Sequence, residues 1–340
     1  MPTLKDIAER VGVNKSTVSR ALSDSGKIAS KTREKILKVA NELGYIPNET
    51  AKVLAGKRSK TIGIILPELD CNYYAGLVGA VESKLKDQGY SLIIGQTGFK
   101  HENEFHYLEL FVRKNLDGIL ISVHDRIKFG KEIVKARKIL KIPVVIIEYF
   151  IDIPDFDVIE IDNMYGIDIA IDHLYKLGHR RIGFISEYLS MGTRYPAYVE
   201  AMKKRNLTIN EKFVKYGYER LELGGYLRMK ELLGEKEIPT AVFVSYDTMA
   251  QGALKAIAEA GMRVPEDISV IGFDNIRESA YFSTPLTTIA PPVLEMSEKA
   301  VDTLLRKIEN DNVSTVQHLS LKPKLIIRES TGPCHECSVI

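Results

Sequence analysis

Three polar side chains near the N-terminus could form hydrogen bonds to the edges of DNA base pairs. Lys15, Ser16 and Arg20 lie at the start of a predicted helix that follows a turn at Gly12. A helix that enters the major groove needs such side chains at its beginning, because lysine and arginine can donate to guanine O6 and N7. The pattern predicts a DNA-reading helix, and a surface three-helix bundle without a nucleic-acid partner is the alternative interpretation.

Three short helices would have to position these side chains. Thr3 and Asp6 have the spacing of a capping box at the start of the first helix. Asn14 can cap the second helix, residues 15–22, whose apolar positions share one face. A third helix is predicted over residues 30–44. Two short helices about a tight turn are typical of a helix-turn-helix motif.

Positive charge is concentrated in the first 60 residues of the chain. This segment holds 13 Lys and Arg but only 6 Asp and Glu, a net charge of +7. The whole chain carries +2, which leaves −5 for residues 61–340. A basic head on a mildly acidic body indicates a polyanionic partner for the head alone, and a solvated basic face is the alternative.

From residue 61 onward, continuous apolar runs alternate with amphipathic helical runs. This pattern is typical of doubly wound parallel α/β sheets. The runs are too numerous for a single sheet, so we expect a core of two lobes. Ligand-binding residues should lie just after the strands. The predicted strands are residues 62–66, 92–94, 118–122, 144–148, 158–161, 182–186, 241–245 and 268–273.

Length and composition set the class of protein. A chain of 340 residues, 45% of them apolar, is long enough for two or three domains. No apolar stretch reaches membrane-spanning length, and the first 25 residues lack the apolar run of a signal peptide. Three cysteines cannot form a disulfide framework, which favours a reducing compartment. We therefore expect a cytoplasmic protein.

The predicted domain boundaries follow these changes of pattern. Residues 1–46 form an all-α helix-turn-helix head, and residues 47–60 form a hinge helix or linker. Residues 61–330 form the core, with lobe one over about 61–161 plus 290–323 and lobe two over about 162–289. We expect residues 331–340 to be a flexible tail.

The sequence resembles the lactose-repressor family of regulators over almost its whole length. The similarity begins in the head and hinge, residues 3–59, and continues through IGIILPEL, IDHLYKLGHRRIGFIS and PEDISVIGFDNIRESAYFSTPLTTI. The resemblance implies a two-lobed core like that of periplasmic binding proteins. It implies a transcriptional repressor without a cofactor, a homodimer or tetramer that binds a palindromic operator. A small carbohydrate-like effector in the cleft would control it.

The resemblance also implies which residues contact DNA. Lys15, Ser16 and Arg20 would read base edges, and Leu54 would be wedged into a central base step from a hinge helix in the minor groove. An apolar wedge unstacks a step at a cost that DNA bending offsets, although an ordinary core leucine is the alternative. The other implied contacts are the phosphate-binding positions Asn14, Thr17, Ser19, Lys27, Tyr45 and Asn48, and the hinge residues Ala55 and Lys57.

Effector-binding residues are implied at the ends of strands. Arginine and carboxylates can bond vicinal hydroxyls while aromatic rings cover an apolar ring face, although each carboxylate could instead form a surface ion pair. Tyr246-Asp247 stands where the family often has Asn-Asp, and Tyr218-Glu219 where it often has Asp-Phe, which leaves the ligand's identity open. The implied residues are Tyr73, Tyr74, Glu148, Tyr149, Arg194, Tyr246, Asp247 and Asp274.

Metal sites and other functions fit the sequence less well. His101 to His106 has the wrong spacing for a zinc site and predicts an exposed helix start, while Cys334 and Cys337 lack a second ligand pair. We expect no metal. A periplasmic sugar receptor would share the core but would need a signal peptide. An enzyme is the third alternative. The sequence shows no Ser/His/Asp order at a nucleophile elbow, no phosphate loop and no metal cluster, although the fold alone would allow catalysis.

Overall fold

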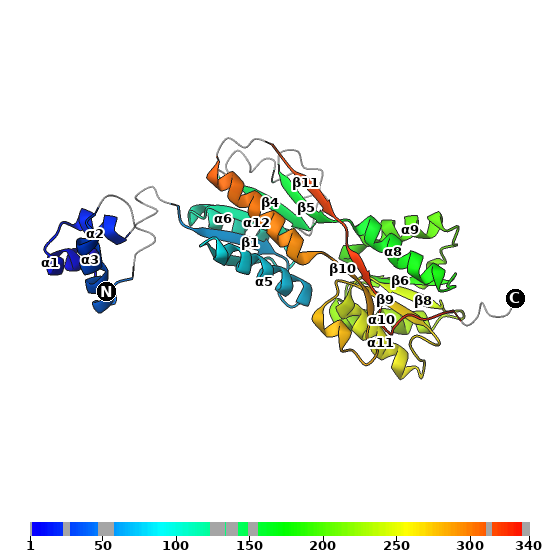
Figure 1. Ribbon diagram of the computed structural model, residues 1–340. Coiled ribbons are helices and arrows are strands. Elements are labelled where there is room, and N and C mark those ends of the chain that lie inside the picture. Colours follow the sequence, from blue (N-terminus) through cyan, green and yellow to red (C-terminus); the bar gives the residue numbers. More distant parts are fainter. Residues whose placement is uncertain are drawn as a thin grey trace. The chain divides into compact units, whose positions relative to one another are not determined.

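The computed structural model describes residues 2–22, 28–46, 58–122, 133, 142–148, 156–310 and 315–334. These fall into two compact units, Met1–Ser59 and Lys60–Ile340 (Figure 1). The boundary lies within the predicted linker, residues 47–60, of which residues 47–57 lie outside the described part of the chain.

The described residues of the first unit include three helices around a small apolar core. The predicted capping box is confirmed, because Thr3 Oγ1 accepts from the Asp6 amide at 3.4 Å and Asp6 Oδ2 accepts from the Thr3 amide at 2.6 Å. Gly12 ends the first helix in the left-handed conformation, with φ of 78°. The helices are α1 (Leu4–Val11), α2 (Lys15–Leu22) and α3 (Ser30–Glu42), and their fully buried side chains are Ile7, Val18 and Ile36.

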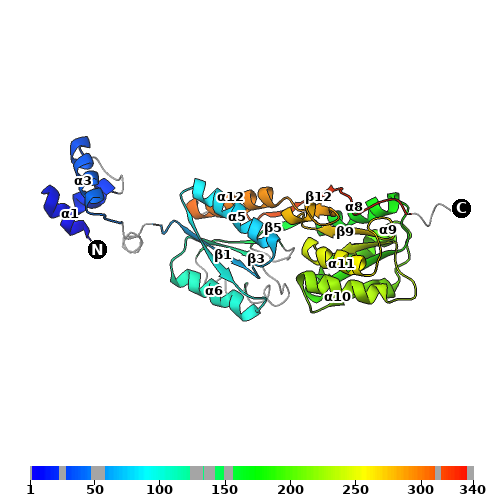
Figure 2. The ribbon, with the colours of Figure 1, turned by 90° about the horizontal axis from the view of Figure 1, so that it is seen from below.

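The first lobe of the second unit is built on a parallel sheet in the order β11-β5-β4-β3-β1-β2. Helices α5 and α12 cover one face and α6 covers the other (Figure 2), so the central strands read as continuous apolar runs. The strands are β1 (Thr61–Leu66), β2 (Ser91–Gln96), β3 (Gly118–Ser122), β4 (Val144–Glu148), β5 (Asp157–Ile161) and β11 (His318–Leu321), and the helices are α5 (Asn72–Asp87), α6 (His101–Arg113) and α12 (Val293–Glu309).

The second lobe contains a sheet in the order β12-β10-β9-β8-β6-β7, parallel except for β12, which runs antiparallel to β10. Helices α8 and α9 cover one face, and α10 and α11 cover the other (Figure 2). The strands are β6 (Ile182–Glu187), β7 (Val214–Gly217), β8 (Ala241–Val244), β9 (Ser269–Phe273), β10 (Thr287–Ala290) and β12 (Lys324–Ile326); the helices are α8 (Asn163–Lys176), α9 (Arg194–Lys204), α10 (Leu221–Leu233) and α11 (Asp247–Glu259), with short 3-10 helices η1 (Tyr188–Gly192), η2 (Glu211–Phe213) and η3 (Arg277–Ala280).

All eight predicted strands are present, and the described part of the chain contains four further strands that were not predicted. Each of β7, β10, β11 and β12 has only three or four residues, too few to show a periodicity. Strand β10 is well buried, whereas the other three lie at sheet edges and mix polar with apolar residues. Tertiary pairing rather than local pattern therefore defines these strands.

Two expectations were wrong. The expected flexible tail, residues 331–340, is wrong for residues 331–334, which pack in the second lobe. The Gly332 amide donates to Ser269 Oγ at 3.1 Å and the Cys334 amide donates to Leu177 O at 2.8 Å, whereas residues 335–340 lie outside the described part of the chain. The predicted helix start at His101 is present but not exposed. His101 Nδ1 lies 2.9 Å from Glu104 Oε2, and the two residues are only 9% and 1% exposed.

Candidate functional sites

The second helix of the head presents one polar and one apolar face. Val18 and Ala21 are buried against the other two helices, whereas Lys15, Ser16 and Arg20 are exposed. The periodicity of the helix places the base-reading candidates together on the side away from the core. The structure thus leaves this face open to a groove of DNA.

The positions implied to contact phosphates lie around the same helix. Asn14 and Ser19 are exposed, Thr17 is partly buried, and Tyr45 packs against the head core. The carbonyl of Asn14 accepts from the Thr17 amide at 2.9 Å and so begins the helix. The remaining predicted DNA contacts lie outside the described residues; they are Lys27, Asn48, Leu54, Ala55 and Lys57.

A small, partly open cavity of about 60 Å³ lies in the second unit at the carboxyl ends of strands from both sheets. This is the place where open α/β sheets bind ligands. Five predicted effector residues line it, namely Tyr73, Tyr74, Arg194, Tyr246 and Asp274. The other lining residues are Glu68, Cys71, Phe99, Glu187, Leu189, Ser190 and Arg220.

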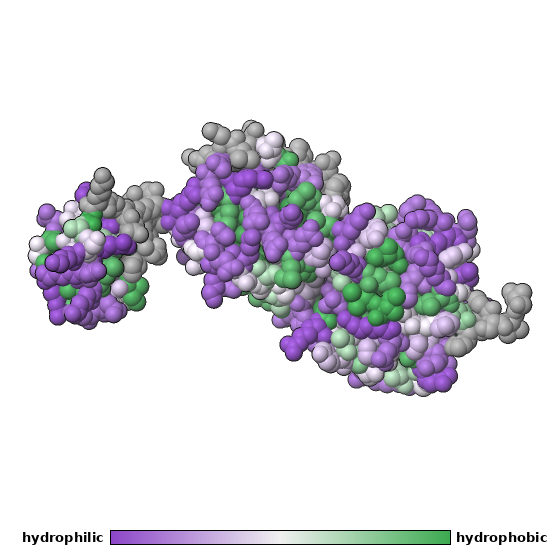
Figure 3. Space-filling view, viewed as in Figure 1, coloured by the Kyte–Doolittle hydropathy of each residue, from purple (hydrophilic) through white to green (hydrophobic). Residues whose placement is uncertain are grey.

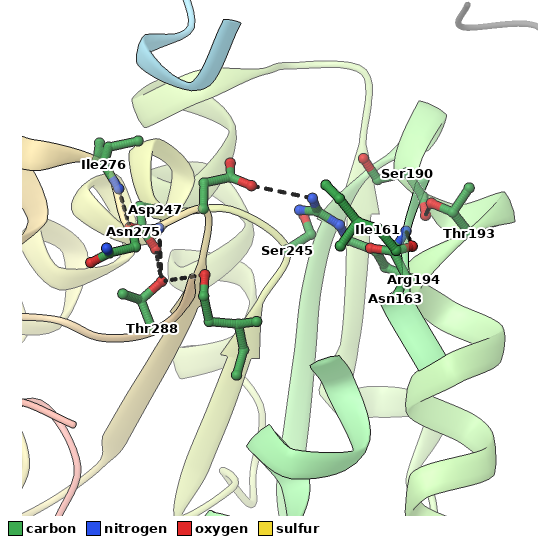
Figure 4. Close-up of polar contacts among 12 residues, drawn as sticks. Ile161, Asn163, Ser190, Thr193, Arg194, Ser245, Asp247, Asn275, Ile276 and Thr288 are labelled. Atoms are coloured by element: carbon green, nitrogen blue, oxygen red, sulfur yellow. Dashed lines mark hydrogen bonds and ion pairs between the residues drawn. The ribbon is translucent and has the colours of Figure 1, made fainter. Parts of the chain in front are cut away.

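An ion pair between Arg194 and Asp274 lies in the wall of the cavity. Arg194 Nη2 is 3.3 Å from Asp274 Oδ1, the ion pair marked at Arg194 in Figure 4. The guanidinium also lies 4.2 Å from the centroid of the Phe273 ring. Burial raises the pKa of Asp274 to about 6, although Arg194 opposes the shift. A paired donor and acceptor over an aromatic ring can bind adjacent hydroxyl groups of one ligand.

Asp247 has a supporting position instead of lining the cavity. Its side chain is fully buried, and it accepts hydrogen bonds from Thr288 Oγ1 at 2.5 Å and from the Ile276 amide at 3.0 Å (Figure 4). Burial, together with the nearby charge of Asp274, raises the pKa of Asp247 well above its usual value. Asp247 therefore holds the loop that carries Asp274.

Gly272 allows this carboxylate to approach the strand. A Cβ at position 272 would lie 2.3 Å from Asp247 Oδ1 and 2.8 Å from Leu286 Cδ2, closer than atoms can pack. Asp274, two residues later, has φ of 111°, a conformation rare for side chains other than glycine. Its amide donates to Ile289 O at 2.8 Å, which holds the strained turn.

The predicted aromatic residues of the lining come from two helix starts. Tyr73 and Tyr74, in the first turn of α5, meet edge to face with ring centroids 5.4 Å apart. Tyr246 precedes α11, and its hydroxyl accepts from the Leu221 amide at 3.0 Å; burial raises the pKa of this phenol. The side chain of Glu148 and all of Tyr149 lie outside the described residues.

A cluster around Arg220 was missed by the sequence analysis. Arg220 Nη2 lies 2.7 Å from Glu68 Oε1, Nη1 lies 3.3 Å from Glu187 Oε2, and the guanidinium lies 4.0 Å from the centroid of the Phe99 ring. All four residues end or follow a strand, and ligands in open α/β sheets bind at strand ends, so this position is the signal that could have identified them. Arg220 directly follows Tyr218-Glu219, the position at which the sequence departs from the family pattern.

Within the described ranges, no group of three or more His, Cys, Asp and Glu residues could hold a metal ion. Of the two cysteines near the C-terminus, Cys334 is among the described residues and Cys337 is not. The same part of the chain contains no helix long and apolar enough to span a membrane.

A helix-turn-helix head in one chain with a two-lobed, cavity-forming core defines a ligand-responsive DNA-binding regulator. Residues 3–48 match the family of bacterial regulatory proteins of the lacI family, and residues 171–331 match the periplasmic binding protein-like domain. The chain is 34% identical over 335 residues to the HTH-type transcriptional repressor PurR of Haemophilus influenzae (strain PittEE), covering 97% of this chain and 98% of the relative.

Solved structures agree with these sequence matches. The Lac repressor dimer bound to operator and the anti-inducer ONPF is similar with a TM-score of 0.88 and 27% identity, covering 97% of this chain and 99% of that one. A complex of the regulator CelR with cellobiose has a TM-score of 0.71 and 26% identity, covering 97% and 100%. The chain belongs to the LacI family: it is a transcriptional repressor, not an enzyme, that binds operator DNA under control of a small effector.

Proposed function

We propose that the effector is a carbohydrate or a close derivative, bound in the cleft by Tyr73, Tyr74, Arg194, Tyr246 and Asp274. The observation that carries this proposal is the Arg194–Asp274 pair beside the Phe273 ring. This donor and acceptor share the cavity wall with the rings of Tyr73, Tyr74 and Tyr246, a combination that suits a ligand ring with hydroxyl edges and an apolar face. The similar regulator CelR was solved with cellobiose.

The cavity must open to admit such a ligand. About 60 Å³ holds only a few water molecules, whereas pockets for small ligands have volumes of roughly 300–1,000 Å³. Separation of the lobes exposes the site, and closure around the ligand then gives the two-state element that an effector needs to control a distant DNA-binding head. Glu148, Tyr149 and Asp247 complete the proposed site, with Asp247 as the support of Asp274.

A thermal-shift screen of purified full-length protein with mono- and disaccharides tests the effector class. A carbohydrate that binds only the folded core should raise the melting temperature in a saturable way. Arg263 forms a surface ion pair outside the cleft, with Nε 3.3 Å from Asp267 Oδ2. Arg263→Ala is therefore the control for cleft variants such as Arg194→Ala, and it should keep the carbohydrate response of the wild type. Absence of any carbohydrate response in a broad panel would refute the proposal.

For the head, we propose that Lys15, Ser16 and Arg20 read base edges, while the hinge around Leu54, Ala55 and Lys57 enters the minor groove. The exposed polar face of α2 supports the first assignment. Phosphate contacts would set the register of the head. The proposed phosphate contacts are Asn14, Thr17, Ser19, Lys27, Tyr45 and Asn48.

We also propose a homodimer on a twofold-symmetric operator in the bacterial cytoplasm, where that DNA lies. One head presents one recognition helix and so reads one half-site. The similar Lac repressor structure is a dimer. Apolar side chains are exposed on both lobes, including Ile94 at 40% and Tyr281 at 81%. Figure 3 shows a hydrophobic area over the second lobe near β10 and β12.

Sedimentation velocity tests the oligomeric state. The protein should sediment as a dimer without DNA, and a monomer at micromolar concentration would contradict the proposed homodimer.

A further inference from the structure

The guanidinium of Arg220 joins the two lobes across the effector cavity. Arg220 follows β7 of the second lobe, whereas Glu68 and Phe99 follow β1 and β2 of the first. The contact to Glu68 is 2.7 Å long and joins residues 152 positions apart in the chain. The side chains of Arg220 and Glu68 are only 24% and 10% exposed, so water screens this charge pair weakly.

The second carboxylate is held in place independently of Arg220. Glu187 accepts from the Leu189 amide at 3.0 Å and from Ser190 Oγ at 2.5 Å. Its side chain is 3% exposed. Removal of the guanidinium would therefore leave a preformed carboxylate, beside Glu68 and the Phe99 ring, without its cation.

The charges of the cavity favour a cation over an anion. Its lining contains three carboxylates, Glu68, Glu187 and Asp274, and two guanidinium groups, Arg194 and Arg220. Arg194 is paired with Asp274, which leaves Arg220 between the other two. An anionic ligand would meet an excess of negative charge, whereas a positive or donor-rich group would meet two acceptors and a ring face.

We propose that Glu68, Glu187 and Phe99 form a cation-binding subsite, which Arg220 occupies as an internal competitor when no effector is bound. The effector then carries an amino or amidino group that displaces the Arg220 guanidinium, a statement that rests on the proposed effector cleft. Displacement also breaks the Arg220–Glu68 link between the lobes. Effector binding thereby exchanges an internal contact between the lobes for contacts that are made through the effector.

Chemical rescue with methylguanidinium tests the subsite without knowledge of the effector. Arg220→Ala removes the internal cation, and methylguanidinium has the size and charge to refill the space. Its binding should raise the melting temperature of full-length R220A by about 2–4 °C at saturation, with no rise for the wild type. Arg220→Met, which keeps the apolar stem of the side chain, is measured in parallel in case R220A fails to fold.

Arg228 provides the matched control. It lies 3.4 Å from Glu219 and 2.9 Å from Glu231, two carboxylates of its own lobe that are 43% and 49% exposed. Because solvent already screens these carboxylates, R228A should show no saturable rescue. Equal rescue of R220A and R228A would overturn the proposal.

Two further arms decide the chemistry of the subsite. Adding Glu68→Gln and Glu187→Gln to R220A should abolish the rescue by methylguanidinium, and a rescue that persists would overturn the assignment.

Inorganic phosphate tests for an anion site. It should not stabilise the wild type through Arg220; stabilisation of the wild type but not of R220A would identify an anion site instead. Methylguanidinium is not a carbohydrate, so failure here leaves the carbohydrate screen to be judged separately.

Discussion

Arg194 and Asp274 lie 80 residues apart in the chain and 3.3 Å apart in the effector cavity. Arg194 begins helix α9, and Asp274 follows strand β9 in a left-handed conformation. The buried Asp247 fixes the loop behind Asp274 through the Ile276 amide. The pair is thus arranged before the effector binds, which reduces the ordering cost of binding.

Loss of either member of this pair should abolish the effector response. Arg194→Ala and Asp274→Ala should each weaken effector binding by roughly 10- to 100-fold, because a hydrogen bond to a charged group contributes about 1.5–3 kcal/mol. Operator affinity without effector should remain near that of the wild type. Calorimetric titration and a gel shift measure the two quantities, with Arg263→Ala as the control. A normal response in both cleft variants would contradict the site.

The raised pKa of Asp274 predicts a pH dependence of stability. Its folded pKa, about 6, exceeds the unfolded value of about 3.9, so the folded protein binds more protons between these two values. The contribution of Asp274 is therefore favourable at low pH and is lost as pH rises through about 6. Relative to Asp274→Asn, the wild type should gain about 1 kcal/mol in free energy of unfolding between about pH 7 and pH 5. Urea unfolding of both proteins measures this, and a constant difference would disprove it.

Gly272 should be intolerant of even one methyl group. Gly272→Ala would place Cβ 2.3 Å from Asp247 Oδ1, so Asp247 must move and release Thr288 and Ile276. We expect a loss of roughly 1–3 kcal/mol in stability together with weaker effector binding. Gly234→Ala is the control, because its Cβ would meet nothing nearer than 3.5 Å and its φ is −80°. Similar melting temperatures for the two variants would argue against the close approach.

Loss of Arg20 and loss of Lys27 should have different effects on DNA binding. Arg20→Ala should reduce the preference for operator over random DNA, because a bidentate contact to guanine contributes about 1–3 kcal/mol of discrimination. Lys27→Ala should weaken binding to all DNA sequences alike. It should also reduce the slope of log affinity against log salt concentration by about one. Anisotropy titrations with both DNAs over a range of salt concentrations separate these effects. Equal loss of specificity in both variants would contradict the assignment.

Residue Leu54 should couple the head to the core through the hinge. A helix as short as the one predicted around residues 48–56 is marginal alone, so we expect it to form only on operator DNA, stabilised by paired leucine wedges. Leu54→Ala should then weaken specific binding and DNA bending while leaving effector affinity nearly unchanged. Hydrogen exchange over residues 48–56 with and without operator is the direct measurement. Equal protection in both states would rule out coupled folding.

Local patterns were sufficient for much of the architecture. The Thr3–Asp6 capping box and the apolar spacing of Val18 and Ala21 are properties of neighbouring residues, so the three head helices could be predicted from the sequence. The long apolar strands could also be predicted, because strands buried on both faces are apolar throughout. The resemblance to the lactose-repressor family implied Tyr73, Arg194 and Asp274 as effector residues, and all three line one cavity at the strand ends.

Only the tertiary structure decided which polar groups face one another. The Arg220–Glu68 contact spans 152 residues and depends on the approach of two lobes, which no local spacing encodes. Asp247 follows a strand as a lining residue would, yet the loop 274–276 covers it, so it supports the cavity wall instead. The last described residues, 331–334, are hydrogen-bonded because β9 and the end of α8 lie beside them. In each case, long-range packing determined whether a polar group meets solvent, ligand or protein.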